Sequence, residues 1–192
     1  DLARVLRGIH AAREAGLGPI KVNAVMLAGE NEAQMEALIH HFAPHASNTH
    51  IRFIEAMPFG PNAKKEHLSA ETMRERLSQR YTLRPITEPQ GGGPAVMWML
   101  EELGLRVGFI APMSGHFCQA CNRLRLMADG SLRTCLSKDT APSLRTLIRA
   151  GVSDEALELA IRRQIWHKTA GHEAHRLRDW KPFEGVMTRI GG

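Results

Sequence analysis

The spacing of three cysteines is the feature that most constrains what this chain can fold into. Cys118 and Cys121 form a Cys-x-x-Cys pair, and Cys135 follows after thirteen further residues. Two thiolates at the first spacing can bind one metal ion or two corners of one cluster. Three cysteines confined to so short a stretch do not match a secreted disulfide scaffold, so the pattern favours a metal or cluster site.

The residues between the cysteines predict a β-hairpin that carries Cys135 back toward the pair. Asp129-Gly130 is a strong turn signal, and it lies between two strand-like segments, 123–127 and 131–136. All three sulfur atoms are therefore expected at one end of the hairpin.

The length of the turn decides which residue lies opposite Cys135. A two-residue turn would pair Leu124 with Cys135, whereas a three-residue loop with Gly130 in the left-handed region would pair Arg123 with it. We predict the three-residue loop, because it places Arg123 and Arg125 on the same side as the sulfur.

Three thiolates leave a tetrahedral metal site one ligand short. His116 could be the fourth ligand of a structural zinc, and such a Cys3His module would serve RNA or protein binding. The other interpretation is a [4Fe–4S] cluster with one iron left open for a substrate. The cysteine spacing by itself leaves both open.

Periodicity predicts alternating helices and strands in the first part of the chain. A helix over 2–15 is followed by a strand over 20–27, a helix capped by Asn31 and running to about His41, and a strand from His50 to Met57. This order implies parallel strands with crossover helices, as in an α/β barrel or open sheet.

A segment rich in Gly, Pro and Asn then indicates a linker near residues 58–65, so we predict domains of 1–60 and 61–192. The second domain is expected to be α+β, and residues 169–192 are expected to be irregular. Its predicted elements are a helix capped by Ser69, strands over 82–86, 95–100 and 105–110, and helices over 142–150 and 153–167.

Charge and hydropathy exclude several classes of protein. Lys and Arg exceed Asp and Glu by 25 − 20 = +5, which fits an anionic partner, while an aromatic content of 5% argues against a base-stacking RNA platform. No apolar run approaches the roughly 20 residues of a membrane span, and no signal peptide is visible. We expect a cytoplasmic protein that binds neither nucleic acid nor membrane, and the first residue, which is not Met, suggests part of a longer chain.

The residues around the cysteines resemble the C-terminal motif of the MoaA family of GTP 3′,8-cyclases. The matching stretches are Phe117-Cys118-x-x-Cys121-Asn122-Arg123-Leu124-Arg125-Leu126 and Asp129-Gly130-x-Leu132-Arg133-x-Cys135-Leu136. This family converts GTP to (8S)-3′,8-cyclo-7,8-dihydroguanosine 5′-triphosphate in molybdenum cofactor biosynthesis. The resemblance implies that the three cysteines bind a [4Fe–4S] cluster whose open iron takes the guanine base. It also implies that the segment Arg123-Leu124-Arg125 contacts GTP.

Two strand segments extend the resemblance. Lys21 and Asn23 share one strand face, which from periodicity alone could line a barrel or face water. Ile20 to Val25 and Arg52 to Met57 resemble family strands, which implies that Lys21 contacts GTP. Asn23 would lie near S-adenosylmethionine, Met57 would contact it, and Arg52 would be a further polar contact.

The final residues Gly191 and Gly192 match the family's double-glycine tail, which enters the active site and which we count as catalytic. Members use a second [4Fe–4S] cluster to cleave S-adenosylmethionine, and the resulting radical removes the C3′ hydrogen of GTP. No cysteine precedes Cys118 here, so that cluster would belong to an N-terminal part outside this chain, and this chain alone is expected to be inactive.

The implied fold is therefore the last βα units of an incomplete radical SAM (TIM-like) barrel, followed by an α+β iron–sulfur domain. The implied partners are GTP, S-adenosylmethionine, a second copy in a homodimer, and the next pathway enzyme, cyclic pyranopterin monophosphate synthase.

Overall fold

The computed structural model describes residues 1–58, 66–87, 93–115, 118, 121–136 and 143–168. Contacts divide the chain into two compact units. Unit 1 comprises Asp1–Met57 and Lys65–Gly115, and unit 2 comprises Pro58–Lys64 and His116–Gly192. Each unit is described by itself.

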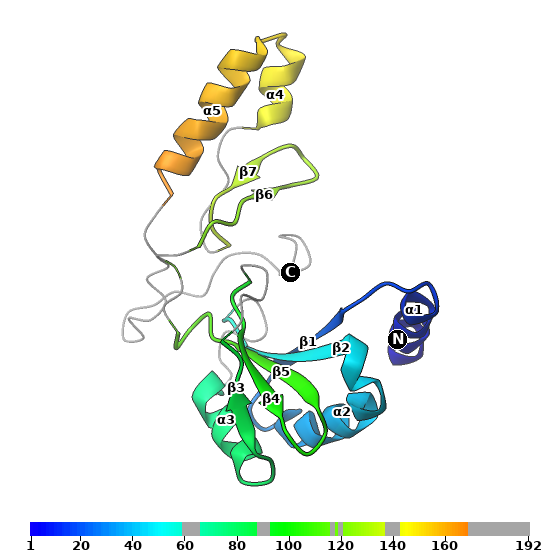
Figure 1. Cartoon of the computed structure of the whole chain (residues 1–192). Helices are drawn as coiled ribbons and strands as arrows, with labels where there is room; N and C mark the ends of the chain where they lie inside the picture. The colour runs from blue at the N-terminus through cyan, green and yellow to red at the C-terminus, as the bar shows by residue number, and fades with distance from the viewer. Residues whose placement is uncertain (59–65, 88–92, 116–117, 119–120, 137–142, 169–192) are drawn as a thin grey trace. The chain divides into compact units, whose positions relative to one another are not determined.

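Unit 1 is built on a five-stranded mixed sheet with the order β1-β2-β5-β4-β3 (Figure 1). β1 and β2 pair in parallel, as do β2 and β5, while β4 and β3 are added antiparallel. The strands are β1 (Ile20–Met26), β2 (Thr49–Glu55), β3 (Leu83–Pro85), β4 (Val96–Leu100) and β5 (Leu105–Ile110).

Helices pack on one face of this sheet and create the core. They are α1 (Leu2–Glu14), α2 (Met35–Phe42) and α3 (Ala70–Ser78), with short 3-10 turns η1 (Glu32–Gln34) and η2 (Ala43–Asn48). Helices α2 and α3 contribute fully buried side chains to the core together with the strands, whereas α1 contributes only partly buried ones. The central cluster comprises Ile39, Ile51, Phe53, Met73, Leu77, Leu105 and Val107. The α/β class predicted from the sequence is confirmed.

Strands β3, β4 and β5 belong to the same sheet as β1 and β2. Because β5 pairs directly with β2, the elements predicted on the two sides of a linker near residue 60 share one core. The contacts therefore divide the chain mainly after Gly115, and not at the expected boundary between 1–60 and 61–192. The expected boundary concerns the domains of the resembled family and stays a prediction.

The predicted start of the second helix is wrong. Asn31 makes no capping bond; its side-chain oxygen accepts from the N–H of Leu27, and its amide donates to the carbonyl oxygen of Val25. These bonds fasten the turn after β1, so the α-helix begins only at Met35. Ser69, by contrast, caps α3 as predicted, its hydroxyl accepting from the N–H of Thr72 at 3.1 Å.

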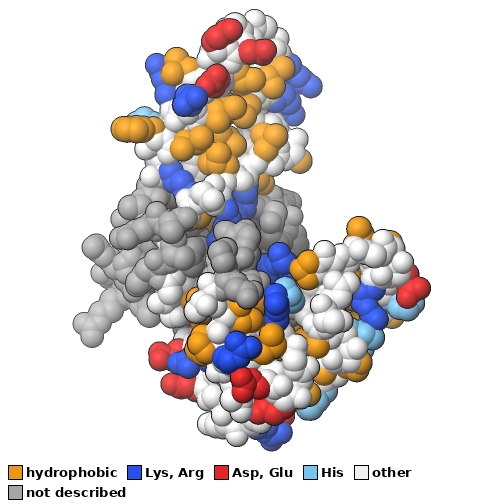
Figure 2. Space-filling model, viewed as in Figure 1, with side chains coloured by type: hydrophobic (Ala, Val, Ile, Leu, Met, Phe, Trp, Pro, Cys, Tyr) orange, Lys and Arg blue, Asp and Glu red, His pale blue; other side chains and the backbone are white. Residues whose placement is uncertain are grey.

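Unit 2 contains a two-stranded hairpin and two helices. The strands are β6 (Arg125–Leu126) and β7 (Leu132–Arg133), and the helices are α4 (Leu144–Arg149) and α5 (Asp154–Trp166). Hydrophobic side chains gather over α4 and α5 in Figure 2, including the exposed Ile148, Leu159 and Trp166. Among the described helices of the whole chain, none is long and apolar enough to cross a bilayer.

A buried carboxylate holds unit 1 together at the carboxyl end of β2. The side chain of Glu55 is fully buried, and it accepts from the N–H groups of Ala70 (2.7 Å), Met113 (2.9 Å) and Ser114 (2.9 Å). The hydroxyl of Ser114 also donates to it, and the imidazole of His67 lies 3.5 Å away. One side chain therefore joins β2, the start of α3 and the loop after β5.

These donors determine the protonation of Glu55. Burial raises its pKa, but the hydrogen bonds from His67, Ser114 and Ala70 outweigh burial and bring the pKa to about 2. The carboxylate is thus ionised in the folded chain at every pH above that value.

We expect Glu55→Gln to lower the free energy of unfolding by about 2–3 kcal/mol at pH 7, because an amide cannot accept all of these bonds. The measurement is chemical denaturation followed by circular dichroism. Glu71→Gln is the control, since the Glu71 side chain is 72% exposed. A loss no larger than that of the control would contradict the role given to Glu55.

The same carboxylate predicts an acid dependence. Because the folded pKa lies below the ordinary 4.5, the stabilisation is complete above pH 4.5 and is lost as the pH falls toward 2. Unfolding measured across this window should therefore show a steeper loss of stability in the parent chain than in Glu55→Gln.

Candidate functional site

The hairpin of unit 2 sets the positions of the residues around the cysteines. Arg125 pairs with Arg133, and the N–H of Met127 donates to the carbonyl oxygen of Ser131 at 2.9 Å. The loop between Met127 and Ser131 therefore has three residues, and Gly130 has a φ of 81°. This is the predicted loop.

Continuing the observed register by two residues would place Arg123 opposite Cys135, but the paired segments end at Arg125 and Arg133, so this pairing stays a prediction. Side chains alternate along the strand: Arg123 and Arg125 are half-buried, whereas Leu124 is 38% and Leu126 68% exposed. Arg123 and Arg125 thus lie on one face of the strand and Leu124 on the other, and Arg125 is within electrostatic reach of Cys135.

Local bonds fix the loop. The carboxylate of Asp129 accepts from the N–H of Ser131 at 2.8 Å and from its hydroxyl at 2.6 Å, which lowers the pKa of Asp129. The N–H of Leu144 donates to the carbonyl oxygen of Gly130 at 2.8 Å, so the beginning of α4 lies on the loop. A Cβ on Gly130 would come within 2.5 Å of the Cβ of Arg145, so both its φ and its surroundings require glycine.

Charges converge on Arg125. Burial lowers the pKa of its guanidinium, and the charges of Arg123 and Arg133 lower it further, while the thiolates of Cys135 and Cys121 raise it. Two of the three cysteines and three arginines therefore lie within electrostatic reach of one another. We call these residues, with Cys118 and Lys168, the sulfur centre.

Arg133 leaves a hydrogen-bond donor unused within this centre. Its Nη1 donates to the carbonyl oxygen of Leu136 at 3.4 Å, but its Nε is buried without a partner in the described part of the chain. Buried donors are normally paired, so an acceptor is expected beside it.

Lys168 binds the Cys-x-x-Cys segment directly. Its ammonium donates to the carbonyl oxygens of Cys121 (2.7 Å) and Arg123 (2.9 Å) and to the Cys121 sulfur (3.4 Å). Burial raises the pKa of the Cys121 thiol, but the N–H of Arg123 and the ammonium of Lys168 outweigh this and lower it. The surroundings of Cys121 thus favour its thiolate, the form that binds metals.

The three sulfur atoms are not gathered as tightly as the ligands of one metal ion. Among the described residues, no three Cys, His, Asp or Glu side chains converge in that way. His116, the predicted fourth zinc ligand, lies outside the described residues, as do Gly191 and Gly192.

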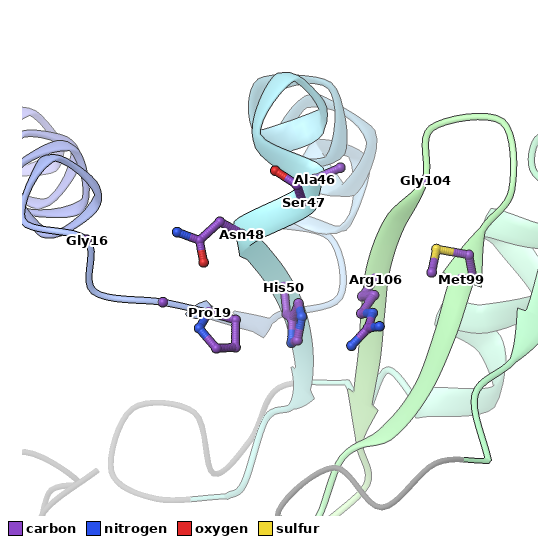
Figure 3. A pocket seen from close by; sticks show the side chains of 10 residues that line it. Gly16, Pro19, Ala46, Ser47, Asn48, His50, Met99, Gly104 and Arg106 are labelled. Carbon is purple, nitrogen blue, oxygen red and sulfur yellow. The ribbon is translucent and has the colours of Figure 1, made fainter.

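A second set of predicted residues lies on the sheet face of unit 1 opposite α2 and α3. Lys21 and Asn23 are exposed on β1, and the register sets His50 opposite Lys21 and Arg52 opposite Asn23. Arg106 of β5 follows opposite His50 (Figure 3). Lys21, Asn23, His50, Arg52 and Arg106 form what we call the open sheet face.

Comparison with known proteins identifies the family. Residues 49–174 match the family model described as Molybdenum Cofactor Synthesis C. The chain belongs to this family. The matched residues include all three cysteines, the hairpin and Lys168, together with His50, Arg52 and Arg106.

Curated relatives extend the similarity to the whole length of the chain. A protein of Paracoccus denitrificans is 39% identical over 90% of this chain and 50% of its own length. Proteins of Corynebacterium glutamicum and Moorella thermoacetica are 37% and 39% identical over 100% of this chain and 52% and 58% of their own lengths. Each is named GTP 3′,8-cyclase. The chain spans about half the length of the curated relatives it matches.

In this member of the Molybdenum Cofactor Synthesis C family, most of the residues that the sequence singled out fall into two separate groups, one in each unit. Lys21, Asn23 and Arg52 share the open sheet face, whereas Met57 is half-buried beyond the end of β2. Arg123 and Arg125 share the sulfur centre with the cysteines. Their individual roles stay predictions.

Four further residues at these sites were not predicted from the sequence: Lys168, Arg133, His50 and Arg106. Lys168 lies 47 residues after Cys121, and no local pattern connects the two. Arg133 belongs to the matched motif, but its position beside Arg125 emerges only from the strand register. His50 and Arg52 lie two residues apart, so the sequence could have predicted that they share a strand face. It could not have predicted that His50 lies beside Lys21 and Arg106, because that depends on which strands pair.

We expect Lys168→Met to raise the pKa of the Cys121 thiol, because a hydrogen bond and a positive charge beside the sulfur are removed. In metal-free protein with Cys118 and Cys135 replaced by serine, alkylation at pH 7 should slow about two- to tenfold, in proportion to the thiolate fraction. Lys21→Met, a change of the same kind in unit 1, is the control. Equal rates in both variants would show that Lys168 does not act on the thiol.

Proposed function

We propose that this chain forms the cluster- and nucleotide-binding part of a GTP 3′,8-cyclase in molybdenum cofactor biosynthesis. The observation that carries the proposal is the sulfur centre, in which Lys168 and the N–H of Arg123 favour the thiolate of Cys121, and Cys121 and Cys135 lie within electrostatic reach of Arg125. The names of the relatives and the matched family support the same conclusion.

The residues present fit a [4Fe–4S] cluster held by Cys118, Cys121 and Cys135. Each thiolate of such a cluster binds a different iron, so the sulfur atoms need not approach as closely as around one ion. A thiolate-bound cluster is an anion, and the buried, unpaired Nε of Arg133 offers it a hydrogen bond. When bound, the cluster would supply one iron without a protein ligand, and that position would hold the guanine base.

Arg123 and Arg125 would then bind phosphate oxygens of GTP. They lie two residues apart on one strand face, and guanidinium groups bind phosphates through paired hydrogen bonds. Leu124 points away from that face, so its contribution would come from its backbone. The task of these side chains is to orient the nucleotide and exclude water, while the cofactors supply the radical chemistry.

The remaining assignments rest on the family resemblance. Lys21 would contact GTP, Asn23 would lie near S-adenosylmethionine, Met57 would contact it, and Arg52 would be a further polar contact. Gly191 and Gly192 would enter the active site. Cleavage of S-adenosylmethionine would depend on a second cluster outside this chain. A homodimer and transfer of product to cyclic pyranopterin monophosphate synthase also stay predictions.

We expect anaerobic reconstitution to load about four iron and four sulfide ions per chain, giving a brown protein whose spectrum changes when GTP is added. Cys135→Ala should lower the iron content, because only two thiolates remain. The measurement is iron, sulfide and zinc analysis of the same sample. A colourless protein with one zinc and no response to GTP would instead support the Cys3His module.

We expect Arg123→Ala to weaken GTP binding about tenfold or more while leaving the iron content unchanged, because a charged hydrogen bond to phosphate is lost. Equilibrium binding to the reconstituted chain tests this. Arg149→Ala, which removes an exposed charge from α4, is the matched control. Loss of iron from Arg123→Ala would show that this arginine supports the cluster rather than the nucleotide.

A further inference from the structure

The open sheet face concentrates positive charge around one buried imidazole. Lys21, His50 and Arg106 occupy opposite positions on three neighbouring strands, β1, β2 and β5. Adjacent strands lie about 4.8 Å apart, so the three side chains start from a row of about 10 Å. Arg52 lies two residues further along β2 on the same face.

These cations have no carboxylate partner within the part of the chain that the structure describes. None of Lys21, Arg52 and Arg106 forms an ion pair with another described residue. Arg84 provides the contrast, because it continues the same row through Met99 but is paired with Glu101 at 3.1 Å. The charge of Arg84 is therefore compensated, whereas no carboxylate of the described residues compensates that of Arg106.

His50 is the buried member of the row. It is only 6% exposed, and no hydrogen bond joins its ring to any other residue that the structure describes. Burial lowers its pKa, and the charges of Arg106, Lys21 and Arg52 lower it further. The ring is thus neutral at pH 7 and keeps one N–H available for an acceptor.

His50 and Arg106 both line a pocket of about 550 Å³ near the amino ends of β1 and β2 (Figure 3). Gly18, Asn48 and Met99 form other parts of its wall. A Cβ on Gly18 would come within 1.9 Å of the Asn48 side chain, so the backbone there lies directly against that wall. The volume is within the range of small-molecule sites.

We propose that Lys21, His50 and Arg106 bind the polyphosphate chain of a nucleoside triphosphate along the open sheet face. Three donors in a row suit an extended anion of several charges better than a compact monoanion. The family resemblance names only Lys21 among them; His50 and Arg106 are new. The nucleotide as the source of the polyphosphate rests on the proposed function.

The test is calorimetric binding of inorganic triphosphate, GTP and GMP to the full chain. Arg106→Gln should weaken binding of inorganic triphosphate and of GTP about tenfold or more, and that of GMP much less. Arg106→Lys, which keeps the charge, should restore most of the affinity. Arg84→Gln is the matched control, because it removes an already paired arginine from the same row.

Equal triphosphate affinity in Arg106→Gln and Arg84→Gln would overturn the proposal, as would an absence of triphosphate binding to the parent chain. Thermal unfolding of each variant confirms that it is folded. A third outcome is that triphosphate binding needs Arg106 but GTP binds no more tightly than triphosphate. The phosphate site would then be supported as a site for free polyphosphate, and the guanine site of the proposed function would be contradicted. The two proposals are thus separated by one set of measurements.

Discussion

The length of one loop controls the chemistry of unit 2. Because side chains alternate along a strand, adding or removing one loop residue would exchange the two faces of the hairpin. The left-handed Gly130 and the packing of α4 against it fix a three-residue loop. The half-buried arginines consequently lie on the sulfur side, and the leucines between them face outward.

Both sites of the chain share an imbalance of charge. Around Cys121, donors come from Arg123 and Lys168, and on the open sheet face positive side chains surround His50. Gathering like charges costs free energy, so such clusters are expected where an anion binds. An iron–sulfur cluster and a polyphosphate are both anions, and this shared property connects the two proposals.

Glu55 shows how a buried charge is used when its purpose is structural. Its acceptors are filled by N–H groups of the backbone and by Ser114, so the carboxylate is satisfied within the fold. The Nε of Arg133, which no described residue satisfies, represents the opposite case. Glu55 thus stabilises the fold, whereas the Nε of Arg133 is available to a ligand.

The amino-acid sequence by itself determined the α/β class, the cap at Ser69 and the three-residue hairpin loop. These follow from periodicity, turn chemistry and capping, which act over a few residues. Only the tertiary structure decided the position of Lys168 beside Cys121, of Arg106 beside His50, and of strands 82–110 in the same sheet as β1. These contacts join residues far apart in the chain, and their energies depend on which strands pair. Asn31 failed as a predicted cap for a local reason, because its side chain bonds to the turn that precedes it rather than to the helix that follows it.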